Sequence, residues 1–317
     1  MEYRTLGTSG LKVSTIAYGS WLTFGNQVEL DKAASIIKRA FELGINYIDT
    51  ADVYNSGEAE KLLGEILTSY NRSQLVIATK AFWPMSDHPI DKGLSRKHII
   101  DSIHGSLKRM NLDYVDIFYC HRFDPSVPLE ETLGAINDMI RQGKILHWGI
   151  SEWTAAQIAE AWGICKANGW YTPVVNQPLY NMLNRYIESD VLPVTRNLGL
   201  GTASFSPLAQ GILTGKYSGG TIPASSRAAD ERLNMFMKDQ LGDSELLHRV
   251  DKLADIAKKY DASTAHIALA WILQREGIST VITGASSVEQ LESNVRASGI
   301  QISDQDMHLI DTLFPAA

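Results

Sequence analysis

The chain has 317 residues, of which 44% are hydrophobic and 21% are charged, and this balance excludes a disordered or fibrous protein. Its formal net charge is −7 and no stretch concentrates Lys and Arg, so we expect no nucleic-acid partner and no attraction to an anionic membrane. No segment approaches the roughly 20 apolar residues that span a bilayer, so we also expect no membrane insertion.

The cysteine content and the N-terminus indicate where the protein resides. Cys120 and Cys165 are the two cysteines, and they show no C-x-x-C spacing, which argues against a disulfide framework and a cysteine-based metal site. The first residues lack the basic and apolar regions of a signal peptide. We therefore expect a cytoplasmic location.

Short β-branched runs alternate with helical patterns along the chain. The predicted strands are residues 15–18, 46–49, 75–80, 115–119, 145–150, 174–176, 200–204 and 280–283. Amphipathic patterns, with apolar residues three and four apart, cover residues 31–43, 95–110, 129–141, 154–167 and 263–274. Asp31 and Ser95 are candidate helix caps, and Gly44 and Gly143 follow helix ends. This alternation predicts a parallel sheet.

Eight such units can form a closed (β/α)8 barrel or an open doubly wound sheet. No G-x-G-x-x-G follows the first strand to hold a pyrophosphate, so we predict an α/β fold of the TIM-barrel type. Residues 3–13 predict an N-terminal β-hairpin that could plug the barrel floor. Residues 211–243 predict a long loop after strand 7, placed where it could cover a cofactor. No linker divides residues 1–317, so we expect one domain.

Catalytic groups of such barrels lie at the carboxyl ends of the strands, where Asp49, Tyr54, Lys80 and His121 stand out. Each alone has an ordinary interpretation, such as a turn cap or a snorkelling lysine. Together they suit carbonyl reduction, because a phenol with a pKa of about 10 is a poor acid unless a positive charge lies nearby. Lys80 can supply that charge, and Asp49 can keep Lys80 protonated. His121 can orient the substrate oxygen.

Other chemistries lack their motifs in this sequence. The eight histidines are scattered and H-E-x-x-H is absent, which argues against a metal-dependent hydrolase and predicts no metal site. G-x-S-x-G and G-x-x-x-x-G-K-[ST] are also absent, which argues against an esterase and a nucleotide hydrolase. Of the chemistries considered, hydride transfer is the one that these residues still suit.

Seven motifs now show a resemblance to a known family. GINYIDTADVY, LVIATK, FYCHRFD, HWGIS, NQPLYN, FSPLAQGILTGKY and ITGASSVEQLESN together resemble the aldo-keto reductase superfamily across nearly the whole chain. Within it, RTLGTSGLKVS and GSWLTFGNQ are most similar to the branch of voltage-gated potassium channel β-subunits and their bacterial reductase relatives. The resemblance implies that Asp49, Tyr54, Lys80 and His121 are the catalytic tetrad and that the enzyme is an NADP-dependent oxidoreductase acting on CH-OH groups.

The resemblance also implies a binding site for NADP(H). Its residues are Ser20, Trp21, Gln27, Asp49, Ser151, Gln177, Phe205, Ser206, Pro207, Leu208, Gly211, Lys216, Arg227, Gly284, Ser286, Gln290 and Asn294. Ser151 and Gln177 would contact the nicotinamide carboxamide, and Phe205 would stack on the ring. Lys216 and Arg227 would bind a 2′-phosphate, which favours NADP over NAD.

At three positions this sequence departs from patterns of the family that it resembles. His121 stands where channel β-subunits tend to carry Asn, which favours a reductase over a channel-associated sensor. Phe205 replaces the usual Tyr or Trp, and Glu152 replaces an Asn or Arg. A carboxylate cannot donate to the carboxamide oxygen, so the role of Glu152 stays open.

Aromatic residues after the strands predict an apolar substrate wall. They are Trp21, Phe82, Trp83 and Tyr180. Such a wall suits hydrophobic or aryl carbonyls without selecting a physiological substrate.

Two other functions stay open, namely a cofactor-sensing, channel-like accessory subunit with incidental turnover and an alcohol dehydrogenase acting in the oxidative direction. The branch includes multimers, so a homo-oligomer also stays open.

Overall fold

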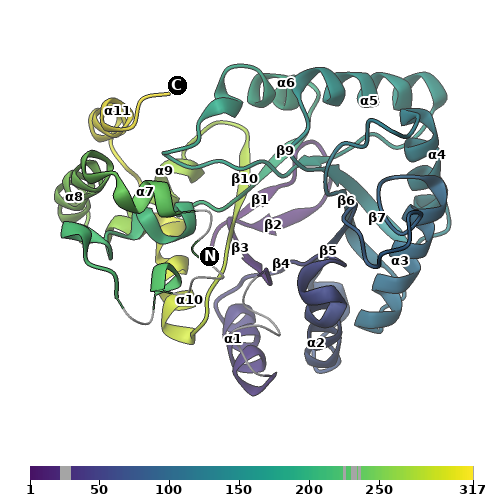
Figure 1. Ribbon diagram of the computed structural model, residues 1–317, viewed down its shortest axis with the longest axis horizontal. Helices are drawn as coiled ribbons and strands as arrows, with labels where there is room; N and C mark the ends of the chain where they lie inside the picture. The colour runs from purple at the N-terminus through teal and green to yellow at the C-terminus, as the bar shows by residue number, and fades with distance from the viewer. Residues whose placement is uncertain (22–29, 224–225, 230–233, 235–236, 317) are drawn as a thin grey trace.

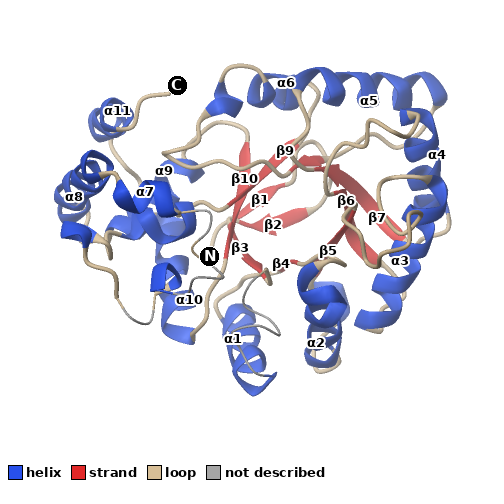
Figure 2. Ribbon diagram, in the orientation of Figure 1, coloured by secondary structure: helices blue, strands red, loops and turns tan. Residues whose placement is uncertain are grey.

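The structure is a computed structural model that describes residues 1–21, 30–223, 226–229, 234 and 237–316. In this part of the chain, eight parallel strands close into a barrel in the order β10-β3-β4-β5-β6-β7-β8-β9, with helices around it (Figures 1 and 2). The barrel strands are β3 (Ile16–Gly19), β4 (Tyr47–Asp49), β5 (Val76–Ala81), β6 (Val115–Cys120), β7 (Ile145–Ile150), β8 (Val175–Asn176), β9 (Gly201–Phe205) and β10 (Ile278–Thr283). The predicted barrel is confirmed, and most strand boundaries agree within about one residue.

Helices follow the strands in the predicted alternation. They are α1 (Leu30–Glu42), α2 (Glu58–Leu67), α3 (Arg96–Met110), α4 (Leu129–Arg141), α5 (Ala155–Asn168), α6 (Val191–Asn197), α7 (Lys238–Gly242), α8 (Ser244–Lys259), α9 (Thr264–Leu273), α10 (Val288–Val295) and α11 (Asp304–Leu313). Ser95 caps α3 as predicted, because its Oγ accepts from the His98 amide at 3.3 Å. The cap assigned to Asp31 is wrong: α1 begins at Leu30, so Asp31 lies inside the first turn.

The barrel interior is filled by side chains from alternate strand positions. Tyr47, Val76, Ile117 and Val175 belong to one buried cluster inside the ring, as expected for residues that point inward at every second position. Leu6 of the N-terminal segment joins the same cluster and is fully buried. The barrel is therefore a packed core, and the polar ends of its strands lie above it.

The predicted N-terminal hairpin is present and closes the floor of the barrel. Its strands β1 (Tyr3–Thr5) and β2 (Lys12–Ser14) pair antiparallel, and Figure 1 shows them across the ring of strands. The Thr8 amide donates to the Gly199 carbonyl at 2.8 Å, just before β9 begins. The Ser14 amide donates to Asn46 Oδ1 at 2.8 Å, just before β4 begins. These contacts lie at the amino ends of the strands, opposite the predicted catalytic groups.

The long segment after β9 contains short 3-10 turns before α7 and α8. The first turn, η4, spans Ala209–Thr214 and includes positive φ angles at Gln210 (57°) and Gly211 (106°). η5 (Ser218–Gly220) and η6 (Arg227–Ala229) follow in the described residues. Across the described ranges, every helix is too short or too polar to traverse a membrane.

The hairpin provides a stability test at Gly7. Gly7 has φ +57°, and a Cβ there would lie 2.5 Å from the Gly201 amide nitrogen and would also collide with the Gly199 carbonyl oxygen. We expect Gly7→Ala to lower the free energy of unfolding by about 2–4 kcal/mol, through backbone strain and overpacking. Urea denaturation measures this change.

The matched control lies in the same hairpin. A Cβ at Gly10 would meet no atom within 4 Å, so Gly10→Ala should change the free energy of unfolding by less than about 0.5 kcal/mol. Equal losses in the two variants would contradict the close packing of the hairpin against the strand ends.

Candidate active site

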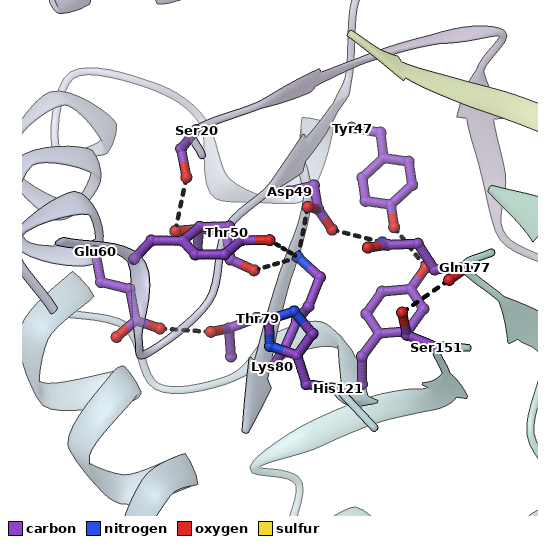
Figure 3. Close-up of polar contacts among 12 residues, drawn as sticks. Ser20, Tyr47, Asp49, Thr50, Glu60, Thr79, Lys80, His121, Ser151 and Gln177 are labelled. Carbon is purple, nitrogen blue, oxygen red and sulfur yellow. Dashed lines mark hydrogen bonds and ion pairs between the residues drawn. The ribbon is translucent and has the colours of Figure 1, made fainter. Parts of the chain in front are cut away.

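The four predicted catalytic residues meet at the carboxyl ends of neighbouring strands. Asp49 ends β4, Lys80 lies in β5, His121 follows β6, and Tyr54 begins the short turn η1 (Tyr54–Gly57). Lys80 Nζ lies at the centre, where it donates to Asp49 Oδ2 at 2.5 Å (Figure 3). It donates to the Tyr54 hydroxyl at 3.1 Å. It also donates to the Thr50 carbonyl at 2.8 Å.

Backbone contacts between the strands determine this arrangement. Asp49 pairs with Ala78 in the β4–β5 register, so the Asp49 and Lys80 side chains both reach the interior near the same strand ends. The Asp52 amide donates to the Lys80 carbonyl at 3.2 Å, and the Tyr54 amide donates to the Ala51 carbonyl at 3.2 Å. These bonds turn the chain after β4 and bring the phenol of Tyr54 over the ammonium of Lys80.

Lys80 is a buried, charged group whose donors are all satisfied. Its side chain is fully buried, and Asp49 is 3% exposed. Burial lowers the pKa of Lys80, but the Asp49 carboxylate and the Tyr54 phenol raise it, and the net pKa lies above the usual lysine value. The ammonium therefore stays protonated, as the sequence predicts.

Two opposite effects act on the pKa of Tyr54. Burial raises the pKa of the phenol, whereas the nearby charge of Lys80 lowers it, and the net pKa lies above the usual tyrosine value. Lys80 thus acts in the predicted direction, but it does not outweigh burial. The phenol consequently carries its proton at neutral pH.

His121 is a neutral, buried imidazole beside this pair. Burial, Lys80 and Arg122 all hold the pKa of His121 well below the usual histidine value. The ring lies edge-on to the Tyr54 ring, with centroids 5.9 Å apart, and Nδ1 is buried without a partner among the described residues. A neutral imidazole can donate one hydrogen bond to an oxygen placed beside Tyr54.

Ser151 and Gln177 extend the network from the far side of the barrel. Gln177 Nε2 donates to Asp49 Oδ1 at 2.8 Å, and Ser151 Oγ donates to the Gln177 carbonyl at 2.8 Å (Figure 3). Asp49 therefore has a hydrogen-bond donor on each carboxylate oxygen, which stabilises its negative charge beside Lys80.

The carboxylate of Glu152 accepts hydrogen bonds from a neighbouring loop. Its Oε1 accepts from the Leu179 amide at 2.6 Å and from the Tyr186 hydroxyl at 2.8 Å. Glu152 also has φ +60°, in the left-handed region. The carboxylate is thus engaged with the segment after β8.

The residues expected at the phosphate end gather around two segments. Gly211 lies beside Lys216, since a Cβ on Gly211 would lie 2.9 Å from Lys216 Nζ. At α10, Gln290 Oε1 accepts from the Ser286 amide at 2.9 Å, and Asn294 Nδ2 donates to the Gly284 carbonyl at 3.4 Å. Three other expected residues, Ser206, Pro207 and Leu208, join β9 to η4.

Two expected cofactor positions fall outside what the structure describes. They are Gln27 and the side chain of Arg227.

Two further expected cofactor residues, Ser20 and Phe205, lie within the described residues. Ser20 is fully buried, and its Oγ donates to Thr50 Oγ1 at 2.9 Å. Phe205 ends β9, and its backbone bridges Leu179 in parallel register.

Three of the four predicted substrate-wall aromatics lie near the catalytic residues. Trp21 is 41% exposed and its ring lies 6.5 Å from that of Tyr54. Trp83 is 38% exposed and packs edge-on against Phe82 at 5.1 Å and His121 at 6.3 Å.

Tyr180 does not belong to this wall. Its side chain is fully buried, its ring lies 5.6 Å from that of Trp271 in α9, and its hydroxyl donates to Glu188 at 2.6 Å. The neighbouring residue Leu179 bridges β9, so the extended chain directs Tyr180 to the opposite side.

Sequence reasoning missed a second group of polar residues behind Lys80. Glu60 is fully buried, accepts from Thr79 Oγ1 at 2.5 Å, and pairs with Arg109 Nε at 2.6 Å. Burial, followed by the charge of Glu60, raises the pKa of Asp52 to about 8. The sequence signal that could have found Asp52 is its position two residues before Tyr54.

Arg122 was also missed, although it directly follows His121. Its Nη1 donates to the His121 carbonyl at 2.5 Å and to Ser151 Oγ at 3.3 Å. A cation next to a predicted catalytic residue at a strand end was the signal that could have found it.

The closed barrel and its buried Lys-Asp pair beside a phenol define a class of barrel oxidoreductases. The sequence model of the Aldo/keto reductase family matches residues 15–314. The chain therefore belongs to the aldo/keto reductase family and has the general function of an oxidoreductase.

Curated relatives agree with this family and with the predicted branch. The chain is 44% identical over 300 residues to a probable voltage-gated potassium channel subunit beta of Oryza sativa subsp. japonica, covering 94% of this chain and 91% of the relative. It is 45% identical to one of Arabidopsis thaliana, with the same coverage. A putative subunit of this name from Schizosaccharomyces pombe is 42% identical, covering 94% and 88%.

The lowered pKa of His121 predicts a pH-dependent stability. Its imidazole stays neutral in the folded protein, whereas the unfolded chain takes up a proton near the ordinary pKa of about 6.5. The unfolded state therefore binds more protons at lower pH, and stability falls as pH falls. Relative to His121→Asn, the wild type should lose up to about 1.4 kcal/mol for each pH unit below 6.5.

Urea denaturation between pH 7.5 and 5 measures this difference. His104→Asn is the control, because His104 is exposed on α3, and it should follow the wild type. Parallel pH profiles for the wild type and His121→Asn would show that His121 becomes protonated in the folded state.

Proposed function

We propose that this protein reduces aldehydes or ketones to alcohols with NADPH, through proton donation by Tyr54. The observation that carries the proposal is the contact of Lys80 Nζ with both Asp49 and the Tyr54 hydroxyl. The reductase acts as one barrel domain over residues 1–317, and family membership supports this assignment.

The residues present fit NADP(H). The Lys216 ammonium lies beside Gly211, and the hydroxyl of Tyr217 is buried without a partner among the described residues, 3.7 Å from where a Gly211 Cβ would be. Lys216, the backbone around Gly211 and the N-terminus of α10 would hold the phosphates. Ser151, Gln177 and Phe205 would hold the nicotinamide, and the bound cofactor supplies a hydride.

The side chains of this chain would provide the other half of the reaction. The Tyr54 phenol holds its proton at neutral pH and donates it to the carbonyl oxygen as the carbon accepts hydride. Lys80 favours the phenolate that remains, because its ammonium lies 3.1 Å from that oxygen. His121, as a neutral donor, orients the carbonyl oxygen toward Tyr54.

The same groups can work in the oxidative direction, with the Tyr54 phenolate accepting the alcohol proton. The raised pKa of Tyr54 favours the protonated form at neutral pH, and this supports reduction.

Two buried free thiols, Cys120 and Cys165, suit a reducing compartment such as the cytoplasm.

A second candidate function is a cofactor-sensing accessory subunit with incidental turnover. The names of the relatives, channel subunit beta, favour it, and such a role would add a membrane partner or a homo-oligomer. His121 favours the reductase, since channel β-subunits tend to carry Asn at this position. Tight NADPH binding with negligible turnover of every carbonyl tested would favour the accessory subunit.

The proton-donor role is tested with Tyr54→Phe. Loss of the hydroxyl should lower kcat for benzaldehyde reduction by about 10²- to 10⁴-fold while NADPH binding persists. NADPH absorbance measures turnover, and quenching of tryptophan fluorescence measures binding. Tyr70→Phe is the control, because Tyr70 packs against Phe41 of α1 and should keep full activity. Wild-type turnover by Tyr54→Phe would exclude this residue as the donor.

The choice of NADPH over NADH is tested with Lys216→Met. Loss of this exposed cation should raise KM for NADPH by about three- to tenfold and leave KM for NADH nearly unchanged. Lys258→Met, which removes an exposed ion pair with Asp255 on α8, should leave both values as in the wild type. An equal rise in KM for the two cofactors would argue against a contact of Lys216 with the 2′-phosphate.

A further inference from the structure

The guanidinium of Arg122 is held in one position beside the catalytic residues. Its Nη1 donates to the His121 carbonyl at 2.5 Å and to Ser151 Oγ at 3.3 Å. Its Cζ lies 5.6 Å from the centre of the Trp83 ring, within the range of a cation–π contact. A guanidinium held in this way loses little further entropy when it binds a ligand.

Within the part of the chain that the structure describes, the hydrogen bonds of Arg122 use one of its three nitrogens, Nη1. Nε and Nη2 have no hydrogen-bond partner among the described residues. Together these two nitrogens form the edge of the guanidinium that matches the two oxygens of a carboxylate. The side chain therefore offers a bidentate donor edge that none of the described residues occupies.

Arg122 also carries a charge that no ion pair compensates in the described residues. Within the described ranges, no carboxylate forms an ion pair with it, and the neighbouring Glu152 carboxylate is held by the Leu179 amide and the Tyr186 hydroxyl. The buried cation, Lys80, is already paired with Asp49. In a protein of net charge −7, an unpaired cation at this end of the barrel would select anionic ligands.

The path from Tyr54 to Arg122 runs along aromatic rings. His121 lies 5.9 Å from the Tyr54 ring and 6.3 Å from the Trp83 ring, and the Arg122 guanidinium lies on that same Trp83 ring. Trp83 is 38% exposed, so its ring is accessible. A molecule with its carbonyl beside Tyr54 and His121 can reach Arg122 across one aryl ring or a short carbon chain.

We propose that Arg122 is a specificity-determining residue, and that the favoured substrates are aldehydes or ketones that carry a carboxylate. The inference rests on the proposed reductase function and names the substrate class of that site. The carboxylate would bind the Nε–Nη2 edge, the aryl or alkyl part would contact Trp83, and the carbonyl would accept from Tyr54 and His121.

The test compares two aldehydes of similar shape and different charge, 4-carboxybenzaldehyde and methyl 4-formylbenzoate. For each protein, the ratio of their kcat/KM values is measured, and comparison with the wild-type ratio cancels their intrinsic reactivities. In Arg122→Met, the ratio of acid to ester should fall by about tenfold or more, mainly through KM for the acid. Arg122→Lys should keep an intermediate ratio, because lysine retains the charge without the bidentate edge.

The matched control is Arg96→Met. Arg96 begins α3 and pairs with Asp138 at 2.7 Å on the exposed surface, so its loss should leave the ratio at the wild-type value. A ratio in Arg122→Met within about twofold of wild type would overturn the proposal, including the case in which both substrates lose activity equally. In that case Arg122 would act only by holding Ser151 and His121.

A measurement on the wild type covers the case in which the variants fail to fold. Benzoate should inhibit reduction of benzaldehyde at least about tenfold more strongly than benzamide, and equal inhibition would overturn the proposal. If neither aldehyde is reduced, the proposed reductase function fails. Calorimetry would then measure the binding of benzoate to the NADPH-loaded protein. Binding of benzoate would support the anion subsite at Arg122, and absence of binding would exclude it.

Discussion

The ion pair between Lys80 and Asp49 is the interaction on which the active site depends. Burial of two charges is costly unless hydrogen bonds satisfy every remaining donor and acceptor. Here Lys80 Nζ has three acceptors, and Asp49 also accepts from Gln177. Both oxygens of Asp49 can therefore be satisfied only in the closed barrel, because the residues that follow β8 must reach the ends of β4 and β5. A small shift of any of these strands would leave a buried charge uncompensated.

Burial, more than this pair, sets the protonation of the groups above it. Burial raises the pKa of Tyr54 against the opposing charge of Lys80, and burial with two nearby cations keeps His121 neutral. The reacting groups are thus two neutral donors over a compensated ion pair. Arg122, farther out, remains as a cation without an ion-pair partner among the described residues. This separation would place the chemistry in a neutral environment and the recognition of charge at its edge.

Much of the fold could be predicted because it follows from local rules. β-branched runs, caps and apolar spacing locate the strands and helices, and the chain-order alternation leads to a parallel barrel. Asp49, Lys80 and His121 could be found for the same reason, since each lies at or next to the carboxyl end of a barrel strand. Tyr180 was misplaced because one residue of extended chain decides which side a side chain faces.

The sequence by itself thus determined the fold, the family motifs and the identity of the residues at the strand ends. Only the tertiary structure decided that Gln177 holds Asp49 from 128 residues away, that Glu152 supports the loop after β8, and that Arg122 lies on Trp83. It also decided that burial outweighs Lys80 at the Tyr54 phenol. The reason is that secondary structure depends on neighbours in sequence, whereas partners and pKa values depend on which groups the closed barrel removes from water together.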